Sequence, residues 1–126
     1  MQEILIPISL GELIDKITIL QIKTEHLQGT ALENVKTELD SLNYKLNNLP
    51  ICIDTKLIKR LKEVNQNLWK IEDEIRDLER QKCFDETFIF LARSIYKKND
   101  NRAAIKKEIN ISYGSALVEE KSYKNY

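Results

Sequence analysis

The chain has 126 residues, which suits one domain, and it is 42% hydrophobic and 32% charged with 3 Gly and 2 Pro. Few helix breakers among many charges favour long amphipathic helices over a β-sandwich or barrel, and the length is sufficient to bury a hydrophobic core. Its 20 basic and 20 acidic residues give zero net charge, which excludes the long-range attraction to phosphate backbones that supports general nucleic-acid binding.

The sequence offers little material for a metal site or for export. The two cysteines, Cys52 and Cys83, are far apart, and His26 is the single histidine, so we expect no zinc site, no other metal and no cofactor. The N-terminus carries Glu3 and lacks the basic start of a signal peptide. Residues 4–22 are apolar but interrupted by charges and a proline, which argues against a membrane span. We therefore expect a cytoplasmic protein with reduced thiols.

The chain begins with an extended segment that leads into a helix. Residues 3–8, EILIPI, are apolar and β-branched and contain a proline, which predicts extended backbone. Ser9 and Glu12 form a capping box, in which the Ser oxygen accepts from the Glu amide and the Glu side chain reaches back. A helix is expected from Leu10 to about residue 28, where a glycine ends it. Apolar residues lie on two of its sides, so it should be central in the fold or at a subunit interface.

Leucine-rich seams predict two further helices. The capping box of Thr30 and Glu33 and a following proline predict a helix over about 31–48, with apolar steps of three and four that are typical of a coiled coil. Asp54 is the candidate N-cap of the next helix, which carries the cleanest pattern in the chain. That seam consists of Leu57, Leu61, Val64, Leu68, Ile71, Ile75 and Leu78.

The last helix is followed by a short tail. Asp85 is the expected N-cap, the helix should run from about 86 to 113, and Gly114 is its stop signal. Residues 115–126 have no clear period and predict an irregular tail. We expect this tail to pair with EILIPI as a small two-stranded patch or to cover the open end of the long hairpin, rather than to serve as a peptide for a partner.

Together these elements predict a single all-α domain over residues 1–126. The fold is four-helix bundle-like, with a long antiparallel hairpin of the third and fourth helices, a short extended N-terminal segment and an irregular C-terminal tail. The last two helices would each be about 40 Å long and the first two about 27 Å. This mismatch leaves the end of the hairpin uncovered, and a homodimer is the preferred way to cover it.

The second half of the last helix departs from plain packing. Its apolar face continues into Asn99, Arg102 and Lys106, and a charge on a buried stripe needs a partner. The third helix carries a parallel stripe on which Glu72 is expected to face a cation of the last helix, beside the flat apolar surface of Trp69. The candidate ligand-binding residues are Trp69, Glu72, Arg76, Arg93, Tyr96, Asn99, Arg102 and Lys106.

Two interpretations of these residues stay open. As an anion pocket, they would take a phosphorylated sugar, a nucleotide or a carboxylate, with Arg102 and Lys106 on the anion and the aromatic rings on its apolar part. If such a protein were an enzyme, Glu72 would be the best candidate acid or base. As a structural network, the same residues would hold the end of the bundle together. The structural interpretation is favoured, because ion-pair networks produce the same residue pattern.

Two carboxylate pairs have the spacing of a helical magnesium site. Glu12 and Asp15, and likewise Glu74 and Asp77, stand three residues apart and share a helix face. The second pair lies off the seam of its helix, and Glu12 is assigned to the capping box. The sequence therefore does not favour a metal site at either pair.

Three blocks of the sequence carry a resemblance. SLGELIDKITILQIK (9–23), NQNLWKIEDEIR (65–76) and the stretch from FLARSIYKKNDNRAAIKKEIN through GSALVEEKSY (90–123) together resemble a family of short, bacterial-type proteins catalogued as a domain of unknown function. The resemblance covers nearly the whole chain and implies a mainly helical protein. It implies no activity and no catalytic residues. The signature of that family includes Trp69, Glu72, Asp73, Arg76, Asn99, Asp100, Arg102 and the tail from Glu119 to Tyr123.

The seams and the doubly apolar first helix predict a helical protein-interaction module. We expect it to self-associate as a homodimer, to bind another protein, and to have no catalytic activity, no general nucleic-acid binding and no membrane segment. The alternative is a small-ligand protein or an enzyme that acts on an anionic metabolite in a pocket between helices.

Overall fold

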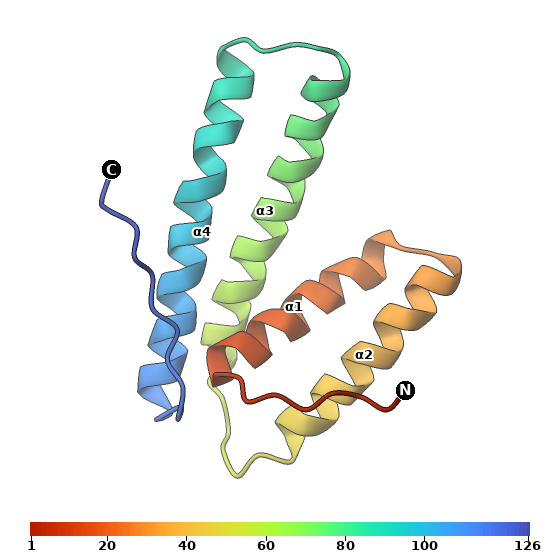
Figure 1. The fold of residues 1–126 in the computed structure, drawn as a ribbon, viewed down its shortest axis with the longest axis vertical. Helices are drawn as coiled ribbons and strands as arrows, with labels where there is room; N and C mark the ends of the chain where they lie inside the picture. Colours follow the sequence, from red (N-terminus) through yellow and green to blue (C-terminus); the bar gives the residue numbers. More distant parts are fainter.

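The computed structural model describes all residues, 1–126, and consists of helices with no strand. The helices are α1 (Leu10–His26), α2 (Gly29–Asn47), α3 (Thr55–Arg80) and α4 (Glu86–Ser112). The long helices α3 and α4 form an antiparallel hairpin, α1 crosses one end of it, and α2 lies alongside α1 (Figure 1). The predicted all-α fold with its long hairpin is confirmed.

Helix α1 is the centre of the fold, because it contacts each of the other three helices. Helix α2 packs against α1 and not against α3 or α4, and none of its residues is buried. The main core cluster lies where α1 crosses the hairpin and consists of Leu10, Ile14, Leu61, Ile105 and Ile109. Of the two positions expected for a helix with two apolar sides, central in the fold or at a subunit interface, the structure shows the central one.

Three predicted N-caps are present and one is not. Ser9 accepts from the Glu12 amide at 3.1 Å, and Asp54 and Asp85 cap α3 and α4. The capping box at Thr30 is wrong, because α2 already begins at Gly29 and Thr30 lies inside the helix. The reciprocal half of the first capping box is also wrong: Glu12 turns its carboxylate to Lys106 of α4, at 2.6 Å from Nζ.

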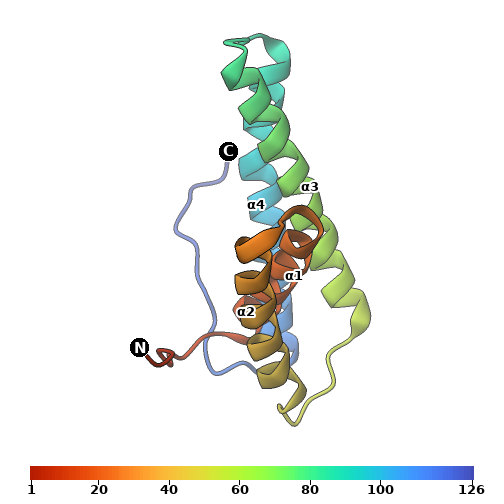
Figure 2. The same ribbon diagram turned by 90° about the vertical axis from the view of Figure 1, so that its right-hand side faces the viewer.

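The tail follows α4 and does not form a strand with the N-terminal segment (Figures 1 and 2). Glu119 and Glu120 bind the ammonium groups of Lys106 and Lys107, at 3.0 and 2.9 Å. At the end of the tail, the ring of Tyr126 meets that of Tyr96 edge-on. The expected two-stranded patch is wrong, because Glu119 and Glu120 of the tail bind Lys106 and Lys107 of α4 and hold the tail against that helix.

Residues 70–98 form the distal half of the hairpin, which extends beyond the end of α1 (Figure 1), and only its first turns on α3 come near α1. Its single buried residue is Leu91, although the seam of α3 continues through this region. Several of its large apolar side chains are more than half exposed: Phe84, Ile89 and Phe90. None of the four helices has the length and apolar content that a membrane span requires.

Gly11 allows α1 and α4 to approach closely. A Cβ atom at this position would lie 2.5 Å from the carbonyl oxygen of Lys106 and 3.0 Å from Oδ1 of Asn110. The Gly11 amide donates to the same Oδ1 at 2.7 Å. The carbonyl is helix backbone and has little room to move, so any side chain here would push the two helices apart.

Replacing this glycine separates packing from helix propensity. Gly11 lies in the first turn of α1, and propensity alone would make Gly→Ala stabilising there, by at most the roughly 1 kcal/mol of a helix interior. The contact with Lys106 instead predicts that Gly11→Ala lowers the free energy of unfolding by about 1–3 kcal/mol, as overpacking does. Urea denaturation followed by circular dichroism measures the change, with Asn34→Ala on the exposed face of α2 as the control. A Gly11→Ala protein as stable as the wild type would contradict the close approach.

Candidate functional site

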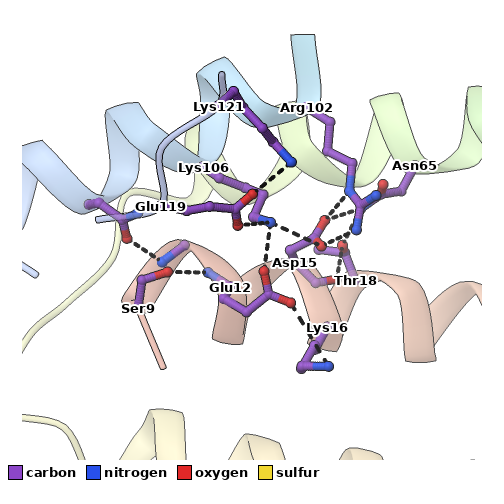
Figure 3. A network of polar contacts seen from close by, with 12 residues as sticks. Ser9, Glu12, Asp15, Lys16, Thr18, Asn65, Arg102, Lys106, Glu119 and Lys121 are labelled. Carbon is purple, nitrogen blue, oxygen red and sulfur yellow. Dashed lines mark hydrogen bonds and ion pairs between the residues drawn. The ribbon is translucent and has the colours of Figure 1, made fainter. Parts of the chain in front are cut away.

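Asp15 is a fully buried carboxylate at the crossing of three helices. It projects from the second turn of α1, and a buried charge is costly unless it is paired and hydrogen-bonded. Its Oδ1 accepts from Asn65 Nδ2 and Arg102 Nε, each at 2.9 Å, and its Oδ2 accepts from Arg102 Nη2 (Figure 3). One carboxylate therefore joins α1 to both α3 and α4.

Thr18 and Asn65 complete the environment of this carboxylate. The Thr18 hydroxyl donates to the Asp15 carbonyl oxygen at 2.8 Å and accepts from Asn65 Nδ2 at 2.9 Å. Asn65 thus uses its amide nitrogen twice, toward Asp15 and toward Thr18. These contacts hold the Asn65 side chain in one orientation.

Lys106 is the second cation at the crossing, and it is buried. Its Nζ lies 2.6 Å from Glu12, 3.0 Å from Glu119 and 3.9 Å from Asp15. Glu119 also contacts Lys121 at 2.9 Å, so the tail is attached to the crossing through charge (Figure 3). We call the connected set the buried polar network; its members are Glu12, Asp15, Thr18, Asn65, Arg102, Lys106 and Glu119.

The electrostatics of the network keep its cations protonated. The hydrogen bond to Asp15 raises the pKa of Arg102 above its ordinary value despite burial. Burial lowers the pKa of Lys106, but the hydrogen bonds to Glu12 and Glu119 outweigh it and leave that pKa raised. The hydrogen bonds from Lys121 and Lys106 lower the pKa of Glu119 to about 2. Cations and carboxylates in this network therefore satisfy one another.

The candidate residues fall into three groups. One group lines a pocket of about 500 Å³ between α1, α3 and α4, and its members are Trp69, Glu72, Arg76, Asn99 and Arg102. Lys106 lies outside that pocket and belongs to the buried polar network. Arg93 and Tyr96 are exposed and join neither.

The prediction that Glu72 faces a cation of α4 is wrong. Glu72 contacts Arg76 of its own helix at 3.5 Å. The carboxylates of Glu12 and Asp15, both from α1, already occupy the α4 cations. The counter-charges thus come from the crossing helix and not from the hairpin partner.

Asp15 is the central residue of the buried polar network, and the sequence pattern alone does not place it there. A signal was present, because α1 is apolar on two sides and Asp15 stands between Ile14 and Ile17 on a helix with few solvent-facing positions. An acid in such a helix needs a cation from another element. Glu12 and Asp15 bind Lys106 and Arg102, and the structure gathers no three His, Cys, Asp or Glu side chains that suit a metal ion.

The comparison with protein families confirms the resemblance carried by the three sequence blocks. A model for a family of unknown function, DUF6165, matches residues 4–126, so the chain belongs to this family. No curated protein and no solved structure matches the chain. Family membership therefore supplies no activity.

Removing only the charge of Asp15 tests the network. Asp15→Asn keeps the shape of the side chain but leaves Arg102 and Lys106 short of a carboxylate, and breaking a buried pair in this way costs about 3–5 kcal/mol. We expect the free energy of unfolding in urea to fall by that amount. Glu72→Gln, which alters a largely exposed pair, should change it by less than about 0.5 kcal/mol. Equal stability of the two variants would show that the network is not structural.

The Glu119 contact predicts a pH dependence of tail attachment. Its folded-state pKa, about 2, lies below the ordinary 4.5. Its contribution to stability is therefore present above about pH 4.5 and is lost as the pH falls toward about 2. The side chain is 38% exposed, so the contribution stays below about 1 kcal/mol.

The matched variant isolates this contribution from other titrating groups. The difference in unfolding free energy between wild type and Glu119→Gln should be largest near neutral pH and should approach zero near about pH 2. A difference that is constant over this range would mean that the carboxylate charge does not hold the tail.

Proposed function

We propose that this family member is a homodimeric helical interaction module, in which the distal halves of two α3–α4 hairpins pack together as a coiled-coil-like four-helix bundle. The observation that supports this most directly is an apolar seam left half-buried. We call it the open seam, and it consists of Ile71, Ile75, Leu78, Phe88, Ala92 and Ile95.

The open seam exists because two helices cannot enclose their own contact stripe. A pair of helices buries one line of residues, and a closed bundle needs further helices on the remaining sides. At the crossing, α1 supplies that cover and leaves Leu61 and Ile109 inaccessible. Helix α1 ends at His26, whose ring stacks on that of Trp69 at 4.7 Å. Beyond that point the seam has no third helix.

The exposed area of the protein is large for its mass. The surface is 9131 Å² for 14.8 kDa, whereas a folded monomer of this mass exposes about 7,000 Å². The extended N-terminal segment contributes to the excess, with Ile4, Leu5 and Ile6 largely exposed. An obligate homodimer buries more than about 1,000 Å² on each partner. The exposed tail contributes to the excess as well, so the part that remains on the hairpin is the surface that such an interface would cover.

A second copy of the chain is the occupant that the composition favours. The net charge is zero, so two copies do not repel each other. A two-fold axis between two hairpins places the same apolar seam on both sides of the interface. A further protein partner would then bind the assembled bundle.

We place the protein in the cytoplasm and propose no catalytic activity for it. Each cation of the buried polar network is held by carboxylates of the same network, which supports a structural use of these charges. Cys52 is exposed and Cys83 is half-buried, and both are free thiols. Unpaired cysteines fit a reducing compartment.

Sedimentation equilibrium tests the proposal, and the expected mass is twice 14.8 kDa. Ile75→Lys places a charge in the open seam and should weaken the dimer by at least about 10-fold while the helical circular dichroism spectrum persists. Phe90→Lys is the control, because Phe90 stands about 200° around α4 from Phe88 at 3.6 residues per turn. It should leave the dimer intact.

Two results would contradict the proposal. One is a mass of 14.8 kDa at micromolar and higher concentrations. The other is a dimer that Phe90→Lys dissociates and Ile75→Lys leaves unchanged, because the interface would then lie on the opposite face of α4.

A further inference from the structure

We infer that the pocket between α1, α3 and α4 binds an uncharged ring that carries several hydroxyl or amide groups, and that it discriminates against the phosphate ester of the same molecule. Free sugars and nucleosides share this chemistry. The site lies beside the crossing of α1, and none of its lining residues belongs to the open seam, so the inference does not depend on dimerisation.

The pocket has the size and the apolar surface of a small-molecule site. Its volume is about 500 Å³, within the range of about 300–1,000 Å³ found for ligand pockets. Ile19, Ile22 and Leu68 supply apolar side chains, and Trp69 supplies a flat ring. Stacking on His26, with an interplanar angle of 22°, fixes the orientation of that ring. A bound ring can therefore place one apolar face against Trp69 without ordering it first.

Asn65 offers a fixed hydrogen-bond acceptor to this pocket. Its side chain is 5% exposed and its amide nitrogen is committed to Asp15 and Thr18. Its carbonyl oxygen Oδ1 accepts no hydrogen bond from the protein. The only side-chain polar atom that is both fully enclosed and without a partner is Nδ2 of Asn110, so Oδ1 of Asn65 is not fully enclosed. Oδ1 of Asn65 is therefore reachable, and Asn65 is one of the residues that line the pocket.

Arg102 offers donors next to this acceptor. Its Nε and Nη2 bind Asp15, which leaves the N–H groups of Nη1 without a partner. The side chain is 29% exposed and lines the pocket. The amide of Asn99 adds a further donor and acceptor. Adjacent fixed donors and acceptors suit hydroxyl and amide groups, because a hydroxyl both donates and accepts.

The charge balance of the lining selects against an anion. The charge of Arg102 is matched by Asp15 behind it, and that of Arg76 by Glu72 at 3.5 Å. Asp73 adds a carboxylate to the lining. A phosphate ester would bring nearly two negative charges to a site with no excess of cations, and would face Glu72 and Asp73. The pocket therefore favours a neutral ligand over the anion that the sequence suggested.

Pairs of ligands that differ only in a phosphate test this inference. The probes are neutral hexoses, N-acetylhexosamines and nucleosides, each with its monophosphate. Trp69 is the single tryptophan of the chain, so its fluorescence reports on the pocket, and calorimetry gives the affinity.

At least one neutral probe should bind with a Kd below about 1 mM, change the fluorescence of Trp69 and bind at least about 10-fold tighter than its phosphate ester. Whether a sugar or a nucleoside gives that signal identifies the source of the ring. Absence of binding by every neutral probe at about 10 mM, or an ester that binds as tightly as its parent, would overturn the inference.

Two asparagines of α4 provide a matched pair of variants. Asn99 lines the pocket and Asn101 does not, and both are exposed. Asn99→Ala should weaken the bound probe about fivefold with an unchanged melting temperature, and Asn101→Ala should have no effect. The reverse result would place the ligand elsewhere. The titration is repeated on Ile75→Lys, the variant that weakens the proposed dimer. An unchanged affinity for the probe shows that binding does not depend on the open seam.

Discussion

The structure depends on one buried carboxylate. Asp15 is inaccessible to solvent and takes its hydrogen bonds from Asn65 on α3 and Arg102 on α4. An apolar contact tolerates small shifts, whereas a buried charge with directional partners fixes the crossing of α1 over the hairpin. Gly11 makes this crossing possible, because only a missing side chain lets α1 approach the Lys106 backbone so closely. The polar interactions therefore set the geometry, and the apolar core fills the space around it.

This arrangement divides the molecule into a closed part and an open part. Around Asp15 the polar side chains of α1, α3 and α4 bind one another, and the core is enclosed. Beyond Trp69 the hairpin continues alone, and its seam stays half-buried. The pocket lies at the boundary between the two parts, where the network holds Asn65 and Arg102 in place. The same network that stabilises the crossing thus preorganises the polar groups that a ligand would meet.

Much of the fold was readable from the sequence, and the partners of the charges were not. Period and caps predicted the helices, because Ser9, Asp54 and Asp85 act within their own turns. The partner of Arg102 depends on how helices cross, which periodicity does not encode. The sequence pattern therefore assigns to Glu72 the role that Asp15 holds, and the local capping motif assigns Glu12 to its own helix and not to Lys106. The α3 seam predicts burial along its whole length, and the mismatch between the long and short helices predicts that one chain leaves the end of the hairpin uncovered.

A double-mutant cycle between Asp15 and Arg102 measures the central interaction most directly. Asp15→Asn, Arg102→Met and the combined variant are compared with the wild type by urea denaturation. If the carboxylate and the guanidinium stabilise each other across the helix crossing, the coupling energy exceeds about 2 kcal/mol, and the double variant is more stable than the two single losses would add up to. A coupling energy near zero would contradict this account, because each side chain would then act without the other.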